Sequence, residues 1–248
     1  MGYQRREREV KEWIPKTELG KKVASGEITS VDEVFASGKK ILEVEIIDRL
    51  LPDLKDEVVE ISSKQRMTAY GRKQTMRAVV LLGNRGGYIG VGVGKAAETR
   101  DAIQEGINDA KKHIIKVDLG CGSWECGCGT GHSIKRKTRG KSSSSEVNLI
   151  PAPKGVGIVA GEFAKKVLEL AGVNDCWSFS KGRTKNVLNT VLATIDALES
   201  LNRLKKGKKM IEEIKEELKT EAIVTDSEKV EKKGEEKPAE TAEAVKVE

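Results

Sequence analysis

Three of the four cysteines and one of the two histidines lie within twelve residues, in the order Cys121, Cys126, Cys128 and His132. Thiolate and imidazole groups are the ligands that zinc takes in tetrahedral structural sites. Five glycines alternate with these residues and would let a short segment wrap around an ion: Gly120, Gly122, Gly127, Gly129 and Gly131. The spacing differs from the paired C-x2-C knuckles of most zinc sites. Three interpretations stay open: a structural zinc site, reduced thiols without a metal, and a site that a partner completes.

A thiol beside an imidazole is also the pair that cysteine nucleophiles use. Such a pair needs a third group that orients the histidine, and the sequence around Cys121–His132 identifies none. Disulfides are not expected either. No apolar run approaches the length of about 18 residues that a membrane helix needs, and the N-terminus MGYQRREREVKEW lacks the apolar segment of a secretory signal. We therefore expect a cytoplasmic protein, in which cysteines stay reduced.

A strand with glycine at every second position, Gly90, Gly92 and Gly94, precedes a helical stretch. Its bare face would allow the close approach of a helix or a ligand. Gly92, Gly94 and Ala97 fit the dinucleotide pattern G-x-G-x-x-A, with Asp118 at a suitable distance downstream. That fold requires a parallel strand, whereas this strand follows VVLLG and the turn NRGG as the return arm of a hairpin. An antiparallel sheet backed by one helix is favoured, and an NAD-dependent oxidoreductase is the enzyme alternative.

Positive charge is unevenly distributed along the chain. The net charge is +6, but residues 212–248 contain 13 acidic residues and 7 lysines, which leaves +12 for residues 1–211. Five cations and no acid occupy positions 135–141. Such a block attracts polyanions through counterion release, without reading a base sequence. Its glycine- and serine-rich flanks predict a mobile basic loop that binds nucleic acid, with a solvated surface loop as the alternative.

Strands and helices of mixed order must position these groups. Three strands are expected at 57–67, 73–83 and 87–94, followed by a helix over 98–113. Before them, Ser30 and Glu33 form a capping-box pattern and residues 41–51 are apolar enough to pack on a core. A second unit is expected from residue 146, with strands at 147–150 and 176–179 and helices at 163–170 and 187–201. Gly172 is the expected C-terminal cap of the first of these helices. The fold class is therefore α+β.

Two long motifs carry a family resemblance. They read GNRGGYIGVGVGKAAETRDAI and LIPAPKGVGIVAGEFAKKVLELAGVNDCWSFSKGRTKNVLNTVLATIDALESL. In this order and at this spacing they resemble the universal small-subunit ribosomal protein S5 family over about residues 54–204. The N-terminal extension and the PAPKGVG wording are similar to the archaeal and eukaryotic branch.

The resemblance implies a double-stranded-RNA-binding-like αβββα domain, followed by a small α+β domain with a left-handed βαβ crossover. The expected organisation is an N-terminal extension at 1–53, the two domains at 54–117 and 146–204 with a Cys/Gly and basic loop at 118–145 between them, and a charged, largely disordered tail at 205–248. Bacterial members read KGGR in the loop between the first two strands. This chain reads Ala69, Tyr70, Gly71 and Arg72, so only the last two positions carry over.

The resemblance also implies a role. Members are structural constituents of the small ribosomal subunit, without catalysis, that bind ribosomal RNA near the channel through which mRNA enters and support translational accuracy. Expected partners are ribosomal RNA and the neighbouring proteins S4 and S8, with no membrane and no homo-oligomer. No cofactor is required, and the zinc question stays separate because bacterial members lack the cysteines. A free double-stranded-RNA-binding regulator is the second alternative.

The cations themselves favour contacts with RNA phosphates. Some lie on the expected hairpins, some in the basic loop and some in the second unit. The full set is Lys64, Arg66, Arg72, Lys73, Arg77, Arg85, Lys95, Lys135, Arg136, Lys137, Arg139, Lys141, Lys154, Lys181, Arg183 and Lys185.

Overall fold

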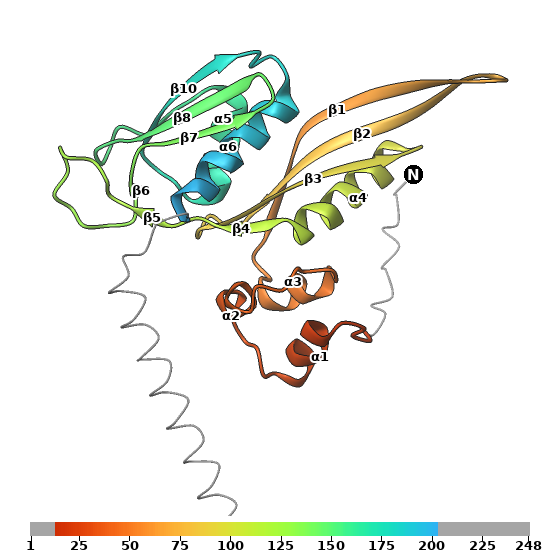
Figure 1. The fold of residues 1–248 in the computed structure, drawn as a ribbon, viewed down its shortest axis with the longest axis horizontal. Helices are drawn as coiled ribbons and strands as arrows, with labels where there is room; N and C mark the ends of the chain where they lie inside the picture. Colours follow the sequence, from red (N-terminus) through yellow and green to blue (C-terminus); the bar gives the residue numbers. More distant parts are fainter. Residues whose placement is uncertain (1–12, 203–248) are drawn as a thin grey trace, which may run out of the picture. The chain divides into compact units, whose positions relative to one another are not determined.

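The structure, a computed structural model, describes residues 13–202 (Figure 1). The tail expected to be disordered, 205–248, lies outside the described residues. Helices and strands alternate along the chain in the order α1(Glu18–Ser25), α2(Val31–Ala36), α3(Glu45–Leu50), β1(Lys55–Thr68), β2(Gly71–Gly83), β3(Tyr88–Ala96), α4(Thr99–Lys112), β4(Ile114–Lys116), β5(Leu119–Gly120), β6(Ser133–Ile134), β7(Thr138–Ser142), β8(Ser145–Pro151), β9(Ile158–Val159), α5(Glu162–Ala171), β10(Cys176–Gly182) and α6(Val187–Asn202). No described helix is both long and apolar enough to cross a lipid bilayer.

The first sheet is antiparallel, with strand order β1-β2-β3-β4, and α4 packs on one of its faces (Figure 1). The order α3-β1-β2-β3-α4 is the expected αβββα arrangement. β3 pairs with β2 only from Met76 to Gly83, while β1 and β2 stay paired out to Thr68 and Gly71. The outer part of the β1–β2 hairpin is therefore a two-stranded ribbon that extends beyond the sheet.

The bare glycine face of β3 lies against α4. A Cβ atom at Gly94 would lie 1.9 Å from the carbonyl oxygen of Ala102, and one at Gly92 would lie 2.1 Å from that of Gly106. Gly106 is in turn close to β3, since a Cβ there would lie 3.3 Å from the Gly94 nitrogen. Strand and helix thus pack backbone against backbone. The alternating glycines are a packing device, and the partner of the bare face is the helix.

The second sheet has strand order β7-β8-β10-β9 and packs against α6. β9 and β10 are parallel and are joined through α5, so a βαβ unit is present; its handedness stays a prediction. α5 ends as expected at Gly172, which has φ +87° and donates its N–H to the carbonyl of Glu169. The prediction of a loop at 118–145 is wrong in part, because this segment contains the short strands β5 and β6 and the whole of β7.

Both sheets contribute to one hydrophobic core. Leu81 and Ile89 from the first sheet are fully buried in the same cluster as Leu168 and Leu198 from the helices of the second. The β2–β3 turn also docks on the end of α5, where the Arg85 N–H donates to Leu170 O over 2.9 Å and the Gly87 N–H to Ala171 O over 3.1 Å. The described residues therefore belong to one compact unit. Independent folding of segments 54–117 and 146–204 stays a prediction.

The N-terminal helices share a smaller core with the first sheet, in which Ile46 and Ile47 of α3 are buried in the same cluster as Ile114 of β4. The expected capping box at α2 is present in a shifted form. The Glu33 N–H donates to Ser30 Oγ over 3.4 Å, but the Glu33 carboxylate accepts from the N–H of Thr29, the residue before the cap, over 3.2 Å.

Polar groups also hold α2 to the first sheet. Asp32 accepts hydrogen bonds from the Tyr88 hydroxyl at 2.8 Å and from Lys116 at 2.7 Å. The Tyr88 ring stacks on Phe35, with ring centroids 6.4 Å apart.

Candidate metal centre and nucleic-acid interface

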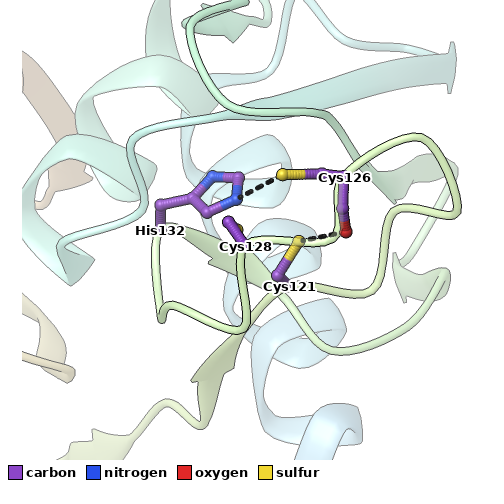
Figure 2. Close-up of side chains that lie close together, drawn as sticks. All are labelled: Cys121, Cys126, Cys128 and His132. Carbon is purple, nitrogen blue, oxygen red and sulfur yellow. Dashed lines mark hydrogen bonds between the residues drawn. The ribbon is translucent and has the colours of Figure 1, made fainter.

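The metal loop, Cys121–His132, is closed at its base by the pairing of β5 with β6 (Figure 2). The Gly122 N–H donates to the Ile134 carbonyl over 3.1 Å. A Cβ at Gly122 would lie 2.1 Å from the Lys135 carbonyl oxygen, so only glycine allows the two arms to approach this closely. The base of the loop therefore brings Cys121 and His132 together although ten residues separate them.

The four expected ligands converge. Their ligand atoms, the sulfurs of Cys121, Cys126 and Cys128 and a ring nitrogen of His132, all lie within 4.8 Å of one another. His132 Nε2 lies 3.8 Å from Cys126 Sγ (Figure 2). Bond lengths of about 2.0–2.3 Å in a tetrahedral zinc site place ligand atoms nearly 4 Å apart. The donor set and its separation fit zinc, with small side-chain movements completing the tetrahedron.

The environment also prepares two of the thiols to lose their protons. Hydrogen bonds from the side chain and the backbone of Thr130 lower the pKa of Cys128 to about 6. A backbone hydrogen bond from Lys154 is the largest influence on Cys126, whose pKa is also lowered. Burial has the opposite effect on Cys121 and raises its pKa. Because thiolates are the ligands of metals, these two lowered pKa values favour coordination.

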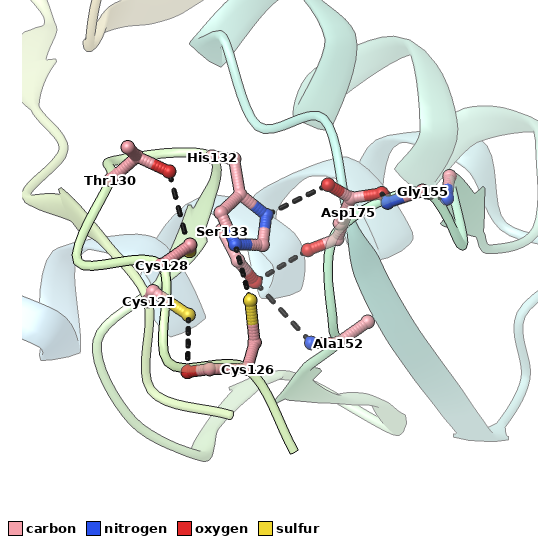
Figure 3. Close-up of polar contacts among 10 residues, drawn as sticks. Cys121, Cys126, Cys128, Thr130, His132, Ser133, Ala152, Gly155 and Asp175 are labelled. Carbon is pink, nitrogen blue, oxygen red and sulfur yellow. Dashed lines mark hydrogen bonds and ion pairs between the residues drawn. The ribbon is translucent and has the colours of Figure 1, made fainter. Parts of the chain in front are cut away.

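Asp175 is the part of this site that sequence reasoning missed. It is 5% exposed and lies 43 residues from His132, yet its Oδ2 is 2.7 Å from His132 Nδ1 (Figure 3). Burial alone would raise the pKa of Asp175, but hydrogen bonds from Gly157, His132 and Gly155 outweigh it and lower the pKa. A carboxylate on the far nitrogen of a ligating histidine is a common second partner in metal sites. No spacing rule links the two residues, because the fold alone brings them together.

Five of the expected RNA contacts line one hollow of about 540 Å³ on the first sheet. This basic groove is formed by Lys64, Arg66, Lys73, Thr75, Arg77 and Lys95. The side chain of Arg77 is 17% exposed and lies 3.7 Å from Glu60, while its buried Nε has no hydrogen-bond partner. A hollow lined by five cations suits an anion such as a phosphate.

The other expected contacts are dispersed. Arg72 is exposed at the tip of the ribbon, next to Tyr70, whose relative exposure is 103%. Arg85 lies at the β2–β3 turn with φ +55°, against the C-terminal end of α5. Lys154 is exposed in the loop between β8 and β9. Exposed cations also occupy the segment from the end of β10 toward α6: Lys181, Arg183 and Lys185.

The basic block 135–141 is not the mobile loop that its composition suggests, because its second half is the edge strand β7. Lys135 pairs with Asp118 at 3.1 Å, and Arg136 donates to the Ser200 carbonyl at 2.6 Å. Arg139 pairs with Glu146 at 2.7 Å. Lys137 and Lys141 are exposed and keep their charge available. The block thus combines cations that stabilise the fold with cations that face solvent.

The dinucleotide alternative is wrong. β3 is antiparallel to both β2 and β4, whereas the nucleotide fold needs parallel neighbours. The backbone of α4 covers Gly92 and Gly94, so no pyrophosphate can reach them. Asp118, the residue expected to bind ribose, is paired with Lys135.

Comparison with known families supports the resemblance that the motifs carry. Residues 54–118 match the family "Ribosomal protein S5, N-terminal domain", and residues 140–211 match "Ribosomal protein S5, C-terminal domain". The Small ribosomal subunit protein uS5 of Methanoregula boonei is 52% identical over 197 residues, which span 79% of this chain and 96% of the relative. That of Methanocaldococcus jannaschii is 51% identical over 193 residues, 78% of this chain and 89% of the relative. The chain belongs to the ribosomal protein S5 family.

This membership decides the class of function. A protein of the S5 family is a structural constituent of the small ribosomal subunit, in the cytoplasmic ribosome, and not an enzyme. It binds ribosomal RNA and other ribosomal proteins. The cations of the basic groove therefore belong to a protein whose family binds RNA. Because members of this family are not enzymes, no catalytic function is assigned to the Cys–His pair.

Proposed function

We propose that this S5-family protein binds ribosomal RNA chiefly through the basic groove and the ribbon beyond it. The observation that carries the proposal is the convergence of five cations on one hollow. Groups so placed neutralise several phosphates at once and release their counterions. The exposed ring of Tyr70 at the ribbon tip adds a surface on which an unpaired base can stack.

The finer placement follows from the family resemblance. The protein would lie near the channel through which mRNA enters, next to S4 and S8, and would support decoding accuracy by restraining the RNA that moves during decoding. A ribbon that extends beyond its sheet suits this role, because it can reach between RNA segments while the shared core stays rigid.

The groove proposal is tested by binding of the full chain to small-subunit RNA at several salt concentrations. Replacing Lys64 and Lys73 with methionine should weaken binding and lower the slope of log K against log salt by about one per lost phosphate contact. Lys21→Met, an exposed cation on α1, is the matched control and should leave the slope unchanged. An unchanged slope in the groove variant would show that the groove does not meet phosphates.

Membership of the ribosomal protein S5 family argues against the second alternative, a free double-stranded-RNA-binding regulator. The integration of this protein in the subunit can also be measured directly. Sedimentation of native small subunits through high salt separates the two, because an integrated protein stays with the subunit while a regulator held by phosphate contacts dissociates.

The second part of the proposal is a structural zinc ion held by Cys121, Cys126, Cys128 and His132. Its support is the convergence of four ligand atoms within 4.8 Å and the carboxylate of Asp175 behind the histidine. Such an ion would fix a loop that has little apolar packing of its own, since Trp124 within it is 92% exposed.

Zinc content of the purified chain decides this point. We expect about one equivalent per chain, and Cys126→Ser should lower both the zinc content and the melting temperature. Cys176→Ser, the remaining cysteine, should leave the zinc content unchanged. Less than about 0.2 equivalents, together with unchanged stability of Cys126→Ser, would favour reduced thiols. Zinc present only in the assembled subunit would favour a site that a partner completes.

A further inference from the structure

The glycine loop, Pro153–Gly157, lies beside the metal loop and shares one carboxylate with it (Figure 3). Gly155 and Gly157 have φ of +94° and +75°, in the left-handed region that favours glycine. Both donate their backbone N–H groups to Oδ1 of Asp175, over 3.0 and 2.8 Å. The other oxygen faces His132 Nδ1 at 2.7 Å. One buried side chain therefore holds the glycine loop with one oxygen and a metal ligand with the other.

Two further links join the loops. The backbone N–H of Lys154 approaches the sulfur of Cys126. Ser133, which follows the histidine, accepts from the Ala152 N–H at 3.4 Å and donates to the carbonyl of Asp175 (Figure 3). Four backbone N–H groups between residues 152 and 157 thus lie against side chains that belong to the metal loop or pack beside it.

The outer surface of the glycine loop is open. Lys154 is exposed, and no described atom lies within 4 Å of the position that a Cβ would take at Gly155 or Gly157. A nucleic-acid backbone can therefore approach this loop closely. The lysine ammonium is a compact charge of the kind that binds phosphate oxygens.

We infer that metal binding to the Cys121–His132 cluster fixes the glycine loop through Asp175 and so raises the affinity of Lys154 for the phosphate groups of RNA. The inference rests on the zinc site and the RNA-binding role proposed above. In it, Asp175 is a positioning residue: it touches neither metal nor RNA and acts through His132 and the two glycine amides.

The chemistry of coordination supplies the coupling. A metal on Nε2 leaves the proton of His132 on Nδ1, where it donates to Asp175. Coordination also holds the sulfur of Cys126 in place, beside the backbone N–H of Lys154. Without the metal neither ligand is held in position, so both links to the glycine loop weaken together.

Asp175→Asn isolates the positioning role. The asparagine oxygen can still accept from Gly155 and Gly157, but its NH₂ group cannot accept from His132 Nδ1–H. The histidine then favours the tautomer whose Nε2 carries the proton, which opposes coordination. We expect zinc affinity about 10- to 100-fold lower and a changed absorption spectrum of the Co²⁺-substituted protein. Asp196→Asn on α6, outside this network, is the matched control and should change neither.

The coupling itself is measured on the full chain with zinc and after its removal by a chelator. Amide hydrogen exchange at 152–157 should speed up on zinc removal, and affinity for a small-subunit RNA fragment should fall at least about fivefold. Lys154→Met should abolish most of this zinc dependence. Lys181→Met, another exposed cation, should weaken binding while keeping the zinc dependence.

The outcomes separate the inference from the proposals beneath it. A chain that takes up no zinc, or that fails to bind RNA when loaded, contradicts the proposed function. If the chain takes up zinc and binds RNA, but neither amide exchange at 152–157 nor RNA affinity changes with zinc, the inference is wrong while the proposed function stands. If Asp175→Asn does not fold, the zinc dependence of the natural chain and of Lys154→Met still decides.

Discussion

At the scale of single residues, tertiary contacts restrict two glycines and one buried aspartate most strongly. Gly92 and Gly94 are fixed by the helix backbone that lies against them, with the Ala102 carbonyl where a Cβ of Gly94 would be. Asp175 is fixed by three donors from two loops. The alternating glycines themselves indicated the first constraint, as a bare face open to a helix or a ligand. The constraint on Asp175 has no such signal, because its donors lie 18 to 43 residues away.

Gly94→Ala should destabilise the protein by about 1–3 kcal/mol or more, because the added methyl group forces strand and helix backbones apart. Gly161→Ala is the control: nothing lies within 4 Å of its added Cβ and its φ of −63° suits alanine. The expected loss is limited to a weaker N-cap of α5, below about 1 kcal/mol. Urea denaturation of both variants measures the effect. Equal stability of the two would mean that β3 and α4 can separate without loss.

At the scale of elements, the N-terminal helices are attached to the sheet through a small polar and aromatic contact as well as an apolar core. Asp32 is the centre of this contact. Hydrogen bonds from Lys116 and then from Tyr88 lower the pKa of Asp32 below its ordinary value. The side chains of Asp32 and Lys116 are about half exposed, so solvent screens much of their attraction.

Asp32→Asn should therefore lower the free energy of unfolding at pH 7 by less than about 1 kcal/mol. A carboxylate whose pKa is lowered in the folded state stabilises it above the unfolded value of about 3.9, and this contribution is lost as the pH falls through the lower folded value. The difference between the two proteins should thus shrink below about pH 4. Glu27→Gln, at an exposed acid in the segment between α1 and α2, is the matched control for changing a carboxylate to an amide. If the difference in the free energy of unfolding between the natural protein and Asp32→Asn persists below about pH 4, the effect of the substitution comes from side-chain packing and not from the charge of Asp32.

The elements that the sequence predicts well are those with local signals. Periodic apolar residues predicted β2, α4 and α6 to within a few residues, and Gly172 and Ser30 predicted a helix end and a helix start. The strands β5, β6 and β7 were missed for two reasons. β5 and β6 have two residues each and pair only across the metal loop, and β7 is polar and lies within the block interpreted as a basic loop. The four metal ligands could be predicted from composition and spacing. Asp175 could not, since only tertiary contacts reveal it.

At the scale of the whole described unit, the two family segments share a core. Leu81 and Leu168 belong to the same buried cluster although they come from different segments. A substitution that weakens this cluster in one segment should therefore destabilise the other segment as well, and the two should unfold cooperatively.

Leu168→Ala tests this cooperativity. We expect a loss of about 2–5 kcal/mol, with amide protection in β2 and α6 falling together. Leu192→Ala, also on a C-terminal helix but 36% exposed, should cost much less. Protection lost in α6 alone, with β2 unaffected, would show that the segments unfold independently.

The docking of the β2–β3 turn on α5 has a consequence for how the chain is made. The N–H groups of Arg85 and Gly87 find their acceptors only at Leu170 and Ala171, about 85 residues later. At about 5–20 residues per second, synthesis of that interval takes roughly 4–17 s. During that time the N–H groups of the β2–β3 turn lack these acceptors, and the apolar face of the first sheet that contains Leu81 and Ile89 is not yet covered. We therefore expect the growing chain to depend on helper proteins or on early RNA contact until α5 has emerged.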